Sequence, residues 1–463
     1  MRLSSLLVLA SFMLALVACD PPDTELLDET DLAITNVSVL PMTSDEVLEN
    51  QTVVVRDGVI TELGPAGEIE IREAVETVDG EGLYLMPGLA EMHAHLPGDD
   101  DPEGIVDDVL TLFVANGVTF ARGMLGAELH LQLREEIAAG DRFGPRLRVG
   151  SPFLSGGQLE TPDNARDVVR GYAEQGYDFL KMGEGLEPDV FDAVVEEAGV
   201  HDIPFSGHVP DAVGLERAME AGQLTVDHLE NFIEAMRTDE APEDFSPIMG
   251  VAQLIDHVDE GRLDELVALA EQTGTGQVPT MLVWERFFGD TPPADYPEQI
   301  EEVRYLPANM VDGWVNQLEN IRDGHTEEQG AAVRDLRHDI LRALANSDTP
   351  ILLGSDAPQM FNVPGFSIHD EMAFMQDEIG MSPFEVLYSG TRAIAEFYGQ
   401  ETDYGAVEVG LRADLVLTTA NPLDDVANAR DVAGVVLNGE WYSGTDLQEM
   451  LQEIEERWAR DDA

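Results

Sequence analysis

Between residues 85 and 400 the sequence repeats one pattern, in which a short apolar run precedes a stretch with apolar residues at helical spacing. Strands that alternate with helices in this way pair in parallel, because each helix returns the chain to the same edge of the sheet. Eight such units within about 316 residues fit a barrel with insertions. The sequence therefore predicts an α/β fold, a (β/α)8 TIM barrel, with strands at 83–92, 118–122, 146–150, 179–182, 204–207, 224–227, 277–282 and 351–354.

The gaps between the expected strands have the apolar spacing of helices, as at 188–198 and 212–221. The longest gap, 284–346, is also helical in pattern and directly precedes the last strand. Because the loops after barrel strands surround the mouth, we expect this insertion to act as a lid.

Both flanks of the barrel alternate apolar and polar residues, which is typical of short strands. Residues 32–84 form one such flank and residues 401–445 the other, and neither is long enough to bury a core alone. We therefore expect the two flanks to pack together as one small composite β-sandwich, with a C-terminal helix at 446–463.

The first 19 residues have the features of an export signal: Arg2, then an apolar run, then Leu16-Val17-Ala18-Cys19. This box resembles that of bacterial lipoproteins, which predicts lipidation of Cys19, an acidic tether at 20–31, and a membrane anchor on the periplasmic or cell-surface side. A plain secretory signal and an uncleaved anchor are the alternatives. Cys19 is the only cysteine, so the chain forms no internal disulfide.

The chain carries 92 acidic and 25 basic residues, a formal net charge of −67. Such a surface repels nucleic acid and anionic lipid headgroups, so neither is an expected partner. Scattered acidity of this size indicates adaptation to high salt, where screening weakens the self-repulsion. An acidic periplasmic protein from an ordinary habitat is the alternative. The expected partner is a small-molecule substrate, and a homo-oligomer is left open.

Histidine, aspartate and the single lysine stand at the ends of several expected strands. Active sites of such barrels lie at the carboxyl ends of the strands, so these side chains should converge on the mouth. His93 and His95 lie at the end of the first expected strand. On extended backbone their i, i+2 spacing places both imidazoles on one face. The candidate metal ligands are His93, His95, Lys181, His208, His228 and Asp356.

Lys181 is the only lysine, and every other basic residue is arginine. A protonated lysine cannot bind metal, but a neutral amine reacts with carbon dioxide to give a carbamate whose oxygens can bridge two metals. Arginine stays charged and cannot do this. We therefore interpret Lys181 as a carboxylated, metal-bridging residue.

Together these motifs resemble the amidohydrolase superfamily, most closely its imidazolonepropionase-like and prolidase-like branch. The similar segments are Pro87–His95, Phe179–Lys181, Gly207–Pro210, Asp227–Glu230, Gly354–Ala357 and Gly410–Val416. The resemblance implies that His93, His95 and Asp356 hold the more buried of two divalent metals. It also implies that His208 and His228 hold the second and that Lys181 bridges the pair. Zinc is the expected metal.

The chain departs from the family pattern at two places and matches it at a third. Glu91 stands where the family signature has aspartate, and Val209-Pro210 follows His208 where dipeptidases of this branch offer a tyrosine to the substrate. Arg122, at the end of the second strand, matches the branch and is predicted to bind a substrate carboxylate. A structural arginine at the barrel rim is the alternative.

These features predict a hydrolase that cleaves an amide or peptide C–N bond with a metal-bridging hydroxide. The substrate would be a dipeptide, an Xaa-Pro peptide or an N-acyl amino acid, and Asp356 would carry the proton to the leaving amine. A lactonase or phosphotriesterase on the same ligands is the alternative. A solute-binding lipoprotein without catalysis would have no use for the lysine carbamate.

Overall fold

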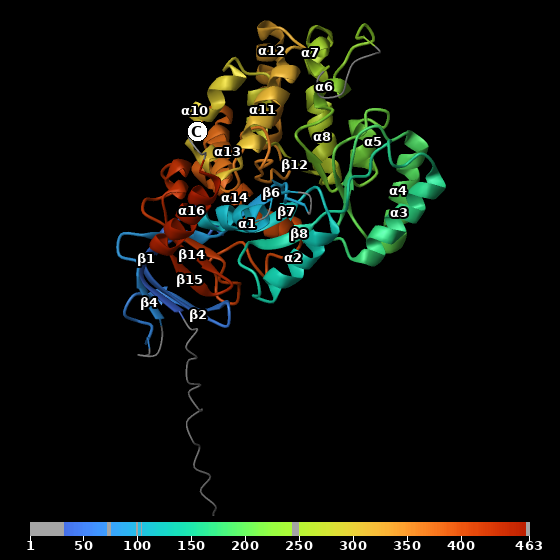
Figure 1. Cartoon of the computed structure of the whole chain (residues 1–463). Helices are drawn as coiled ribbons and strands as arrows, with labels where there is room; N and C mark the ends of the chain where they lie inside the picture. The colour runs from blue at the N-terminus through green and yellow to red at the C-terminus, as the bar shows by residue number, and fades with distance from the viewer. Residues whose placement is uncertain (1–31, 72–75, 99–100, 103, 243–249, 460–463) are drawn as a thin grey trace, which may run out of the picture.

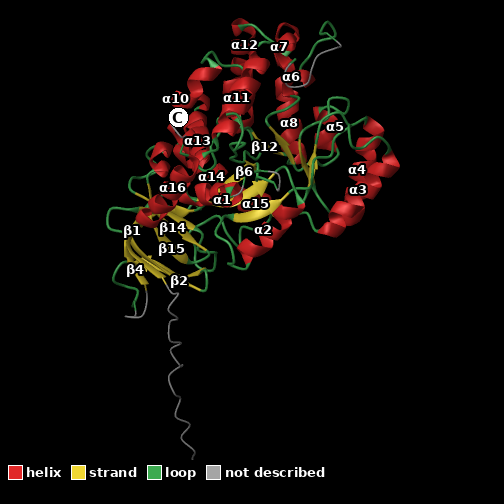
Figure 2. Ribbon diagram, viewed as in Figure 1, coloured by secondary structure: helices red, strands yellow, loops and turns green. Residues whose placement is uncertain are grey.

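The computed structural model describes residues 32–71, 76–98, 101–102, 104–242 and 250–459. The predicted export signal, lipidated Cys19 and acidic tether lie outside the described residues, as do residues 460–463. None of the helices in the described ranges is both long and apolar enough to cross a membrane. Figures 1 and 2 show a helix-rich part built around parallel strands, with a sheet of β-strands beneath it.

The sheet beneath takes strands from both flanks of the chain, as the blue and red strands that lie together in Figure 1 show. Its path runs β15-β14-β13-β5-β1-β2-β3, with β4 beside β1. The junction is antiparallel, with Leu415 of β13 opposite Pro87 of β5. The strands are β1 Leu32–Val39, β2 Leu48–Arg56, β3 Val59–Pro65, β4 Glu76–Asp79, β5 Tyr84–Pro87, β13 Leu415–Thr418, β14 Val432–Leu437 and β15 Glu440–Ser443.

Apolar side chains from strands of both flanks form one buried cluster against this sheet, and Ile34, Val53 and Leu415 are fully buried in it. The two flanks therefore do share one core, as the sequence predicts. In the described residues they form a single hydrogen-bonded sheet rather than the two separate sheets of a sandwich, because β5 and β13 pair edge to edge.

The first predicted barrel strand, 83–92, is two strands. β5 belongs to the sheet of the flanks, and β6, Leu89–Ala94, begins the parallel part. Gly88 separates them, and a Cβ at this position would lie 2.1 Å from Oγ1 of Thr119. Only glycine lets the backbone pass so close to the neighbouring strand. The boundary of the parallel part thus falls at residue 88, a few residues beyond the predicted one.

The parallel strands form two sheets, and their positions agree with seven of the predicted runs. One sheet has the order β6-β7-β8 and the other β12-β11-β10-β9. The remaining bounds are β7 Val118–Gly123, β8 Arg146–Val149, β9 Leu180–Met182, β10 Phe205–Gly207, β11 Thr225–Asp227 and β12 Gly276–Val278.

The predicted eighth strand, 351–354, is not a strand in the structure. Single parallel bridges pair Ile351 with Gln277 and Ala357 with Ala94, and another pairs Gly150 with Phe179. These bridges link the two sheets on both sides, but the described strands do not make one closed eight-stranded sheet. Extended backbone ends at Asp356, whose φ of 63° is left-handed.

Helices fill the gaps as predicted, including most of the 284–346 insertion, and one predicted strand is shorter because Met281 already begins a helix. The C-terminal helix starts two residues earlier than predicted, capped by Ser443. The helices are α1 Ile105–Ala115, α2 Glu128–Ala138, α3 Pro162–Gln175, α4 Pro188–His201, α5 Leu215–Glu220, α6 Phe232–Ala235, α7 Val251–Leu254, α8 Leu263–Thr273, α9 Met281–Phe287, α10 Tyr296–Gln299, α11 Ala308–Arg322, α12 Glu327–Ala345, α13 Phe366–Phe374, α14 Pro383–Ser389, α15 Arg392–Phe397 and α16 Gly444–Trp458.

Candidate active site

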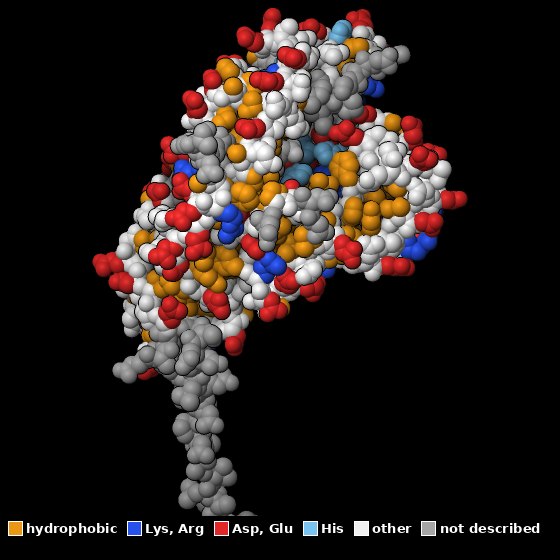
Figure 3. Space-filling model, viewed as in Figure 1, with side chains coloured by type: hydrophobic (Ala, Val, Ile, Leu, Met, Phe, Trp, Pro, Cys, Tyr) orange, Lys and Arg blue, Asp and Glu red, His pale blue; other side chains and the backbone are white. Residues whose placement is uncertain are grey.

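Histidine side chains gather at the floor of a hollow that opens between the α3–α5 side and the α11–α12 side of the molecule (Figure 3). The segments that carry the predicted ligands are the ends of β6, β9, β10 and β11 and the bridge segment after Ile351. Carboxyl ends of parallel strands meet at one edge, which brings residues far apart in the sequence to one place.

Asp356 is the centre of the first group of side chains. Its Oδ1 lies 2.7 Å from Nε2 of His95 and 3.6 Å from Nε2 of His93, and its Oδ2 lies 3.8 Å from Nδ1 of His228. The rings of His93 and His228 are 4.4 Å apart between centroids. One ligand atom each from His93, His228 and Asp356 fit within 4.8 Å of one another, a spacing at which one metal ion could be held.

His208 and His228 form a second group, with Glu230 as its third member, again with ligand atoms within 4.8 Å. Oε1 of Glu230 lies 2.7 Å from Nδ1 of His208, and its Oε2 accepts a 3.4 Å hydrogen bond from the Val209 amide. The sequence reading missed Glu230 as a site residue. Its place two residues after His228 gave no signal, because His228 and Leu229 have positive φ and the i, i+2 rule applies only to extended backbone.

Lys181 lies in β9, paired in register with Ser206 of β10, and is 1% exposed. Its Nζ has no hydrogen-bond partner in the described residues. Burial lowers the pKa of Lys181 below its usual value, although the charges of Asp227, Glu230 and Asp356 oppose this shift. The amine is therefore displaced toward the neutral form that carbamate formation requires.

These residues fit a divalent-metal centre. Buried polar atoms almost always have partners, yet both ring nitrogens of His93, Nζ of Lys181 and Oδ1 of Asp356 lack hydrogen bonds in the part of the chain described. Burial also lowers the pKa of His93 and His228 well below the usual value, so both imidazoles are neutral at neutral pH and keep a free lone pair. A set of imidazoles with oxygen ligands suits zinc and similar ions.

Glu91 lies beneath this group and joins two ligand-bearing segments. Its Oε1 accepts hydrogen bonds of 2.8 Å from the amides of His93 and Ser355, and its Oε2 accepts one of 2.5 Å from the Ser355 hydroxyl. Burial raises the pKa of Glu91 to about 8. The carboxyl group that replaces the family's aspartate thus holds His93 and the residue before Asp356 in fixed relative positions.

Two more side chains contact the ligands directly. Oγ1 of Thr280 lies 2.7 Å from Nδ1 of His228, and Nε2 of Gln359 donates a 3.1 Å hydrogen bond to Oδ2 of Asp356. Such contacts fix which ring nitrogen or carboxylate oxygen faces a metal. Neither residue carries a sequence motif that could have identified it.

Arg122 does not reach the hollow, which is a correction to its predicted role. It is fully buried, and its Nε donates to the Met92 carbonyl at 2.6 Å and its Nη1 to the Thr225 hydroxyl at 3.0 Å. Nη2 donates to both oxygens of Asp227 at 3.0 and 3.1 Å. All three nitrogens are therefore engaged inside the parallel strands, and the substrate-binding role does not fit this position.

Asp227 connects Arg122 to the candidate ligands, because its Oδ2 lies 2.9 Å from Nδ1 of His93, although not in hydrogen-bonding alignment. Burial alone would raise the pKa of Asp227, but the charge of Arg122 holds it below its usual value. Arg122 thus stabilises a buried carboxylate under the site, a structural role, although inside the parallel strands rather than at the barrel rim.

A family model described as "Amidohydrolase family" matches residues 84–442 of this chain. Among curated proteins, imidazolonepropionase from Methylobacterium nodulans is 27% identical over 246 residues. That alignment covers 41% of this chain and 62% of the relative, so the chain spans less than two thirds of that protein's length.

Two solved structures show the same fold over nearly the whole chain. Bottromycin amidohydrolase superposes with a TM-score of 0.70 at 22% identity, covering 93% of this chain and 91% of that one. A Xaa-Pro dipeptidase with bound methionine in its active site has a TM-score of 0.65 at 19% identity, covering 89% and 100%.

Proposed function

This chain belongs to the amidohydrolase family, and from that premise we propose that it hydrolyses an amide or peptide C–N bond with two divalent metal ions, zinc by preference. The observation that carries the proposal is the set of buried ligand atoms without hydrogen-bond partners, on His93, Lys181 and Asp356. Leaving such groups unpaired costs about 1–3 kcal/mol each. That cost is offset if metal ions occupy the space between them.

In this proposal His93, His95 and Asp356 would hold the more buried ion, His208 and His228 would hold the other, and carboxylated Lys181 would supply a shared oxygen ligand. When bound, two such ions lower the pKa of water and stabilise negative charge on an attacked carbonyl. Together with the bridge segment after Ile351, the two parallel sheets would form a (β/α)8 barrel with these residues at one end.

The chain's own residues supply the remaining chemistry. His93 and His228, neutral because of burial, keep lone pairs for the ions. Asp356 is within contact distance of three histidines, a position from which it can accept a proton and return it to the leaving amine. Glu91 accepts a hydrogen bond from the amide of Ser355, next to this aspartate, and Gln359 donates one to the aspartate itself.

The proposed substrate is a dipeptide, an Xaa-Pro peptide or an N-acyl amino acid. It is supported by the names of the fold relatives, one an amidohydrolase and one a Xaa-Pro dipeptidase with an amino acid in its active site. The engaged position of Arg122 removes the support it was expected to give to a free carboxylate.

We also propose that the protein is exported and anchored to a membrane by a lipid on Cys19. Labelling of the expressed full chain with radioactive palmitate should mark the wild type and leave Cys19→Ser unlabelled. Equal labelling of both, or recovery of unlabelled wild type in the soluble fraction, would overturn the anchor while leaving the catalytic proposal intact.

The decisive experiment measures metal content and hydrolysis together on residues 20–463. Mass spectrometry of the purified protein should find close to two divalent ions per chain, and chelator treatment should abolish release of amine from dipeptides and N-acyl amino acids. Active protein with one ion or none would overturn the binuclear site. Hydrolysis of lactones or phosphotriesters without any amide hydrolysis would overturn the substrate class.

A further inference from the structure

Two buried hydrogen-bond donors beside the candidate metal centre have no acceptor. Nε1 of Trp284, in α9, and Nε of Arg337, in α12, are both inaccessible and without a hydrogen-bond partner in the described residues. Trp284 is 4% exposed and Arg337 2%. An indole N–H and a guanidinium N–H can only donate, so each needs an oxygen acceptor that the described chain does not supply.

Arg337 contacts both Trp284 and the backbone of His228. The guanidinium carbon of Arg337 lies 3.6 Å from the centre of the Trp284 ring, and Trp284 stacks in turn on Phe288. Nη2 of Arg337 donates to the backbone carbonyl of His228. No carboxylate of the described residues lies within ion-pair distance of this arginine. The inserted segment 284–346 thus presents two oriented donors at the edge of the metal centre.

Trp284 and Arg337 both line a small cavity, which adjoins a larger one. Trp284 and Arg337 line a cavity of about 10 Å³ together with Glu230, which contacts His208. A volume of about 10–15 Å³ accommodates one water or one oxygen atom of similar size.

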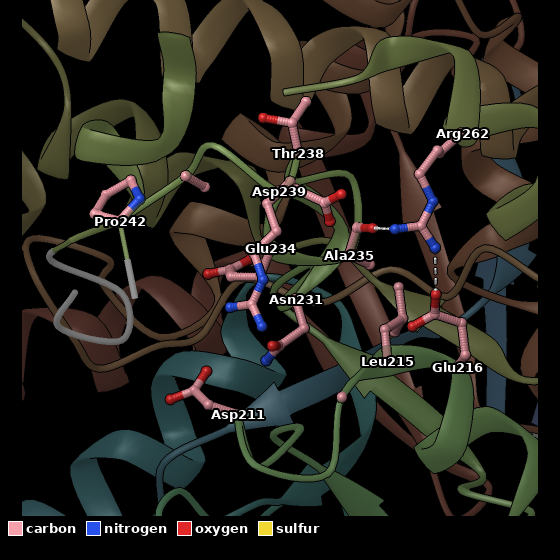
Figure 4. Close-up of a pocket in the computed structure, with 13 residues that line it drawn as sticks. Asp211, Leu215, Glu216, Asn231, Glu234, Ala235, Thr238, Asp239, Pro242 and Arg262 are labelled. Atoms are coloured by element: carbon pink, nitrogen blue, oxygen red, sulfur yellow. Dashed lines mark hydrogen bonds and ion pairs between the residues drawn. The ribbon is translucent and has the colours of Figure 1, made fainter. Parts of the chain in front are cut away.

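This small cavity shares Asp211, Asn231 and Glu234 with a second cavity of about 400 Å³. Figure 4 shows the larger space, with Asp211 and Asn231 on one side and Arg262, bonded to Glu216, on the other. It is large enough to admit part of a small molecule, whose oxygen could then enter the narrow end.

The charge of the surroundings selects a neutral acceptor over a carboxylate. Glu184, Asp211, Glu230 and Glu234 all line the small cavity, against the single positive charge of Arg337. Burial, with repulsion among these acids, raises the pKa of Glu184 and Asp211 and raises that of Glu234 to about 7. An anionic group would add to this repulsion, whereas a carbonyl oxygen accepts two hydrogen bonds without adding charge.

We propose that Trp284 and Arg337 form a subsite that binds a second, neutral carbonyl oxygen of the substrate, one residue away from the scissile amide. The subsite deepens the proposed amide hydrolysis and rests on it. It favours substrates with two consecutive carbonyl groups, such as N-acylated amino amides and peptides, over simple amides. The inserted helices then determine which amides bind, while the strand ends carry out the reaction.

The test uses two pairs of amides that differ only in the second carbonyl. N-acetylphenylalanine p-nitroanilide is compared with 3-phenylpropionyl p-nitroanilide, and 3-phenylpropionyl-glycinamide with 3-phenylpropionyl-ethylamide, so that either side of the scissile bond is covered. Trp284→Phe keeps the stacked ring and removes only the N–H. It should raise KM about 3- to 10-fold for the two-carbonyl member of one pair, the range expected for one hydrogen bond, with kcat nearly unchanged.

Binding without turnover gives an independent readout. A ketomethylene analogue of the favoured two-carbonyl amide should bind the metal-loaded protein 3- to 10-fold more weakly in Trp284→Phe by calorimetry. Trp314→Phe is the matched control, since Trp314 is a buried tryptophan of α11 in the same insertion, packed edge-to-face against Phe361 and lining neither cavity. It should leave all four substrates unchanged.

Equal KM changes for both members of each pair would overturn the subsite in favour of a packing role. No change for any member would overturn it too, because the donors would then hold only a water. A larger effect on free N-acetylphenylalanine than on its amides would overturn the neutral acceptor in favour of an anion. A wild type that hydrolyses none of these amides would overturn the proposed function itself, a result distinct from hydrolysis without carbonyl preference.

Discussion

The flank sheet and the edge of the parallel strands bury their side chains to the same extent but with opposite chemistry. In the flank sheet Ile34 and Leu415 are fully buried in a cluster of apolar side chains. At the strand ends His93, Lys181 and Asp356 are just as inaccessible, yet they hold polar atoms without hydrogen bonds.

This difference separates stability from function along one chain. Burial of an aliphatic side chain stabilises the fold by about 1.5–3 kcal/mol, whereas a buried polar atom without a partner destabilises it. The unpartnered polar groups therefore destabilise the strand ends, a cost that the proposed metal ions would offset, whereas the flank sheet contributes stability through apolar burial. Substitutions in the two regions should act on different quantities.

The largest effect is expected at Lys181. Lys181→Ala should reduce kcat/KM by about 10³-fold or more, because it removes the proposed bridge between the metals. Its melting temperature should stay close to that of the wild type, because the lost amine has no hydrogen bond to contribute. Activity and thermal unfolding are measured on the same preparations.

Lys181→Arg is the matched control and should be equally inactive, since arginine cannot form a carbamate. Partial recovery of Lys181→Ala by added short carboxylic acids would support the bridging role. Full activity of Lys181→Arg would show that the carbamate interpretation is wrong.

Arg122 sharpens the comparison, because it lies under the site but all of its side-chain nitrogens donate hydrogen bonds. Arg122→Ala should lower the free energy of unfolding by about 3–5 kcal/mol, the cost of leaving Asp227 buried without its partner. Urea unfolding gives this value. The same variant should change KM equally for an N-acyl amino acid and for its methyl ester, and a KM rise confined to the acid would restore the predicted carboxylate contact.

Ile34→Ala tests the opposite region. Removing this fully buried side chain from the flank sheet should cost about 2–5 kcal/mol of stability. Metal content and kcat per folded molecule should stay at wild-type values. Val409→Ala, at a 58% exposed position, is the control and should change stability by less than about 0.5 kcal/mol. Loss of metal in Ile34→Ala would mean that the two regions are coupled.

Glu230 should influence metal binding more than stability. Glu230→Gln removes the carboxylate that contacts Nδ1 of His208, and the affinity for the second ion should fall about 10- to 100-fold. Competition with a chromogenic chelator measures this affinity. Glu174→Gln, at an exposed position of α3, should have no effect. Unchanged affinity in Glu230→Gln would reduce this residue to a bystander.

The smallest effect concerns the surface common to both regions. With a net charge of −67, self-repulsion acts over a Debye length of about 30 Å at 0.01 M salt and about 3 Å at 1 M. The melting temperature should therefore rise with sodium chloride across this range. A melting temperature independent of salt would contradict the saline adaptation and leave the site unaffected.

The sequence predicted which candidate residues gather at one edge better than the direction of individual side chains. His93, His95, Lys181, His208, His228 and Asp356 could be found because parallel strands bring their carboxyl ends together, whatever the details of packing. Arg122 also ends a strand, but only the structure shows that its guanidinium faces Asp227 across the strands.

Local backbone geometry explains the remaining differences. Glu230 was missed because the chain after β11 turns sharply, with positive φ at His228 and Leu229, and strand periodicity no longer applies there. The strand at 351–354 failed because left-handed Asp356 ends the extended run. Gly88 divides one apolar run between two sheets through a close approach to Thr119, which no local pattern encodes.

The pairing of β13 between β5 and β14 has a consequence for how the protein is made. Strands β1 to β5 leave the ribosome early, but the neighbour that covers the edge of β5 begins only at Leu415. Until then the nascent chain presents an unpaired strand edge, which is a site for aggregation. Synthesis of those intervening residues takes tens of seconds at about 5–20 residues per second. A chain truncated before β13 would keep that edge unpaired, so we expect it to aggregate.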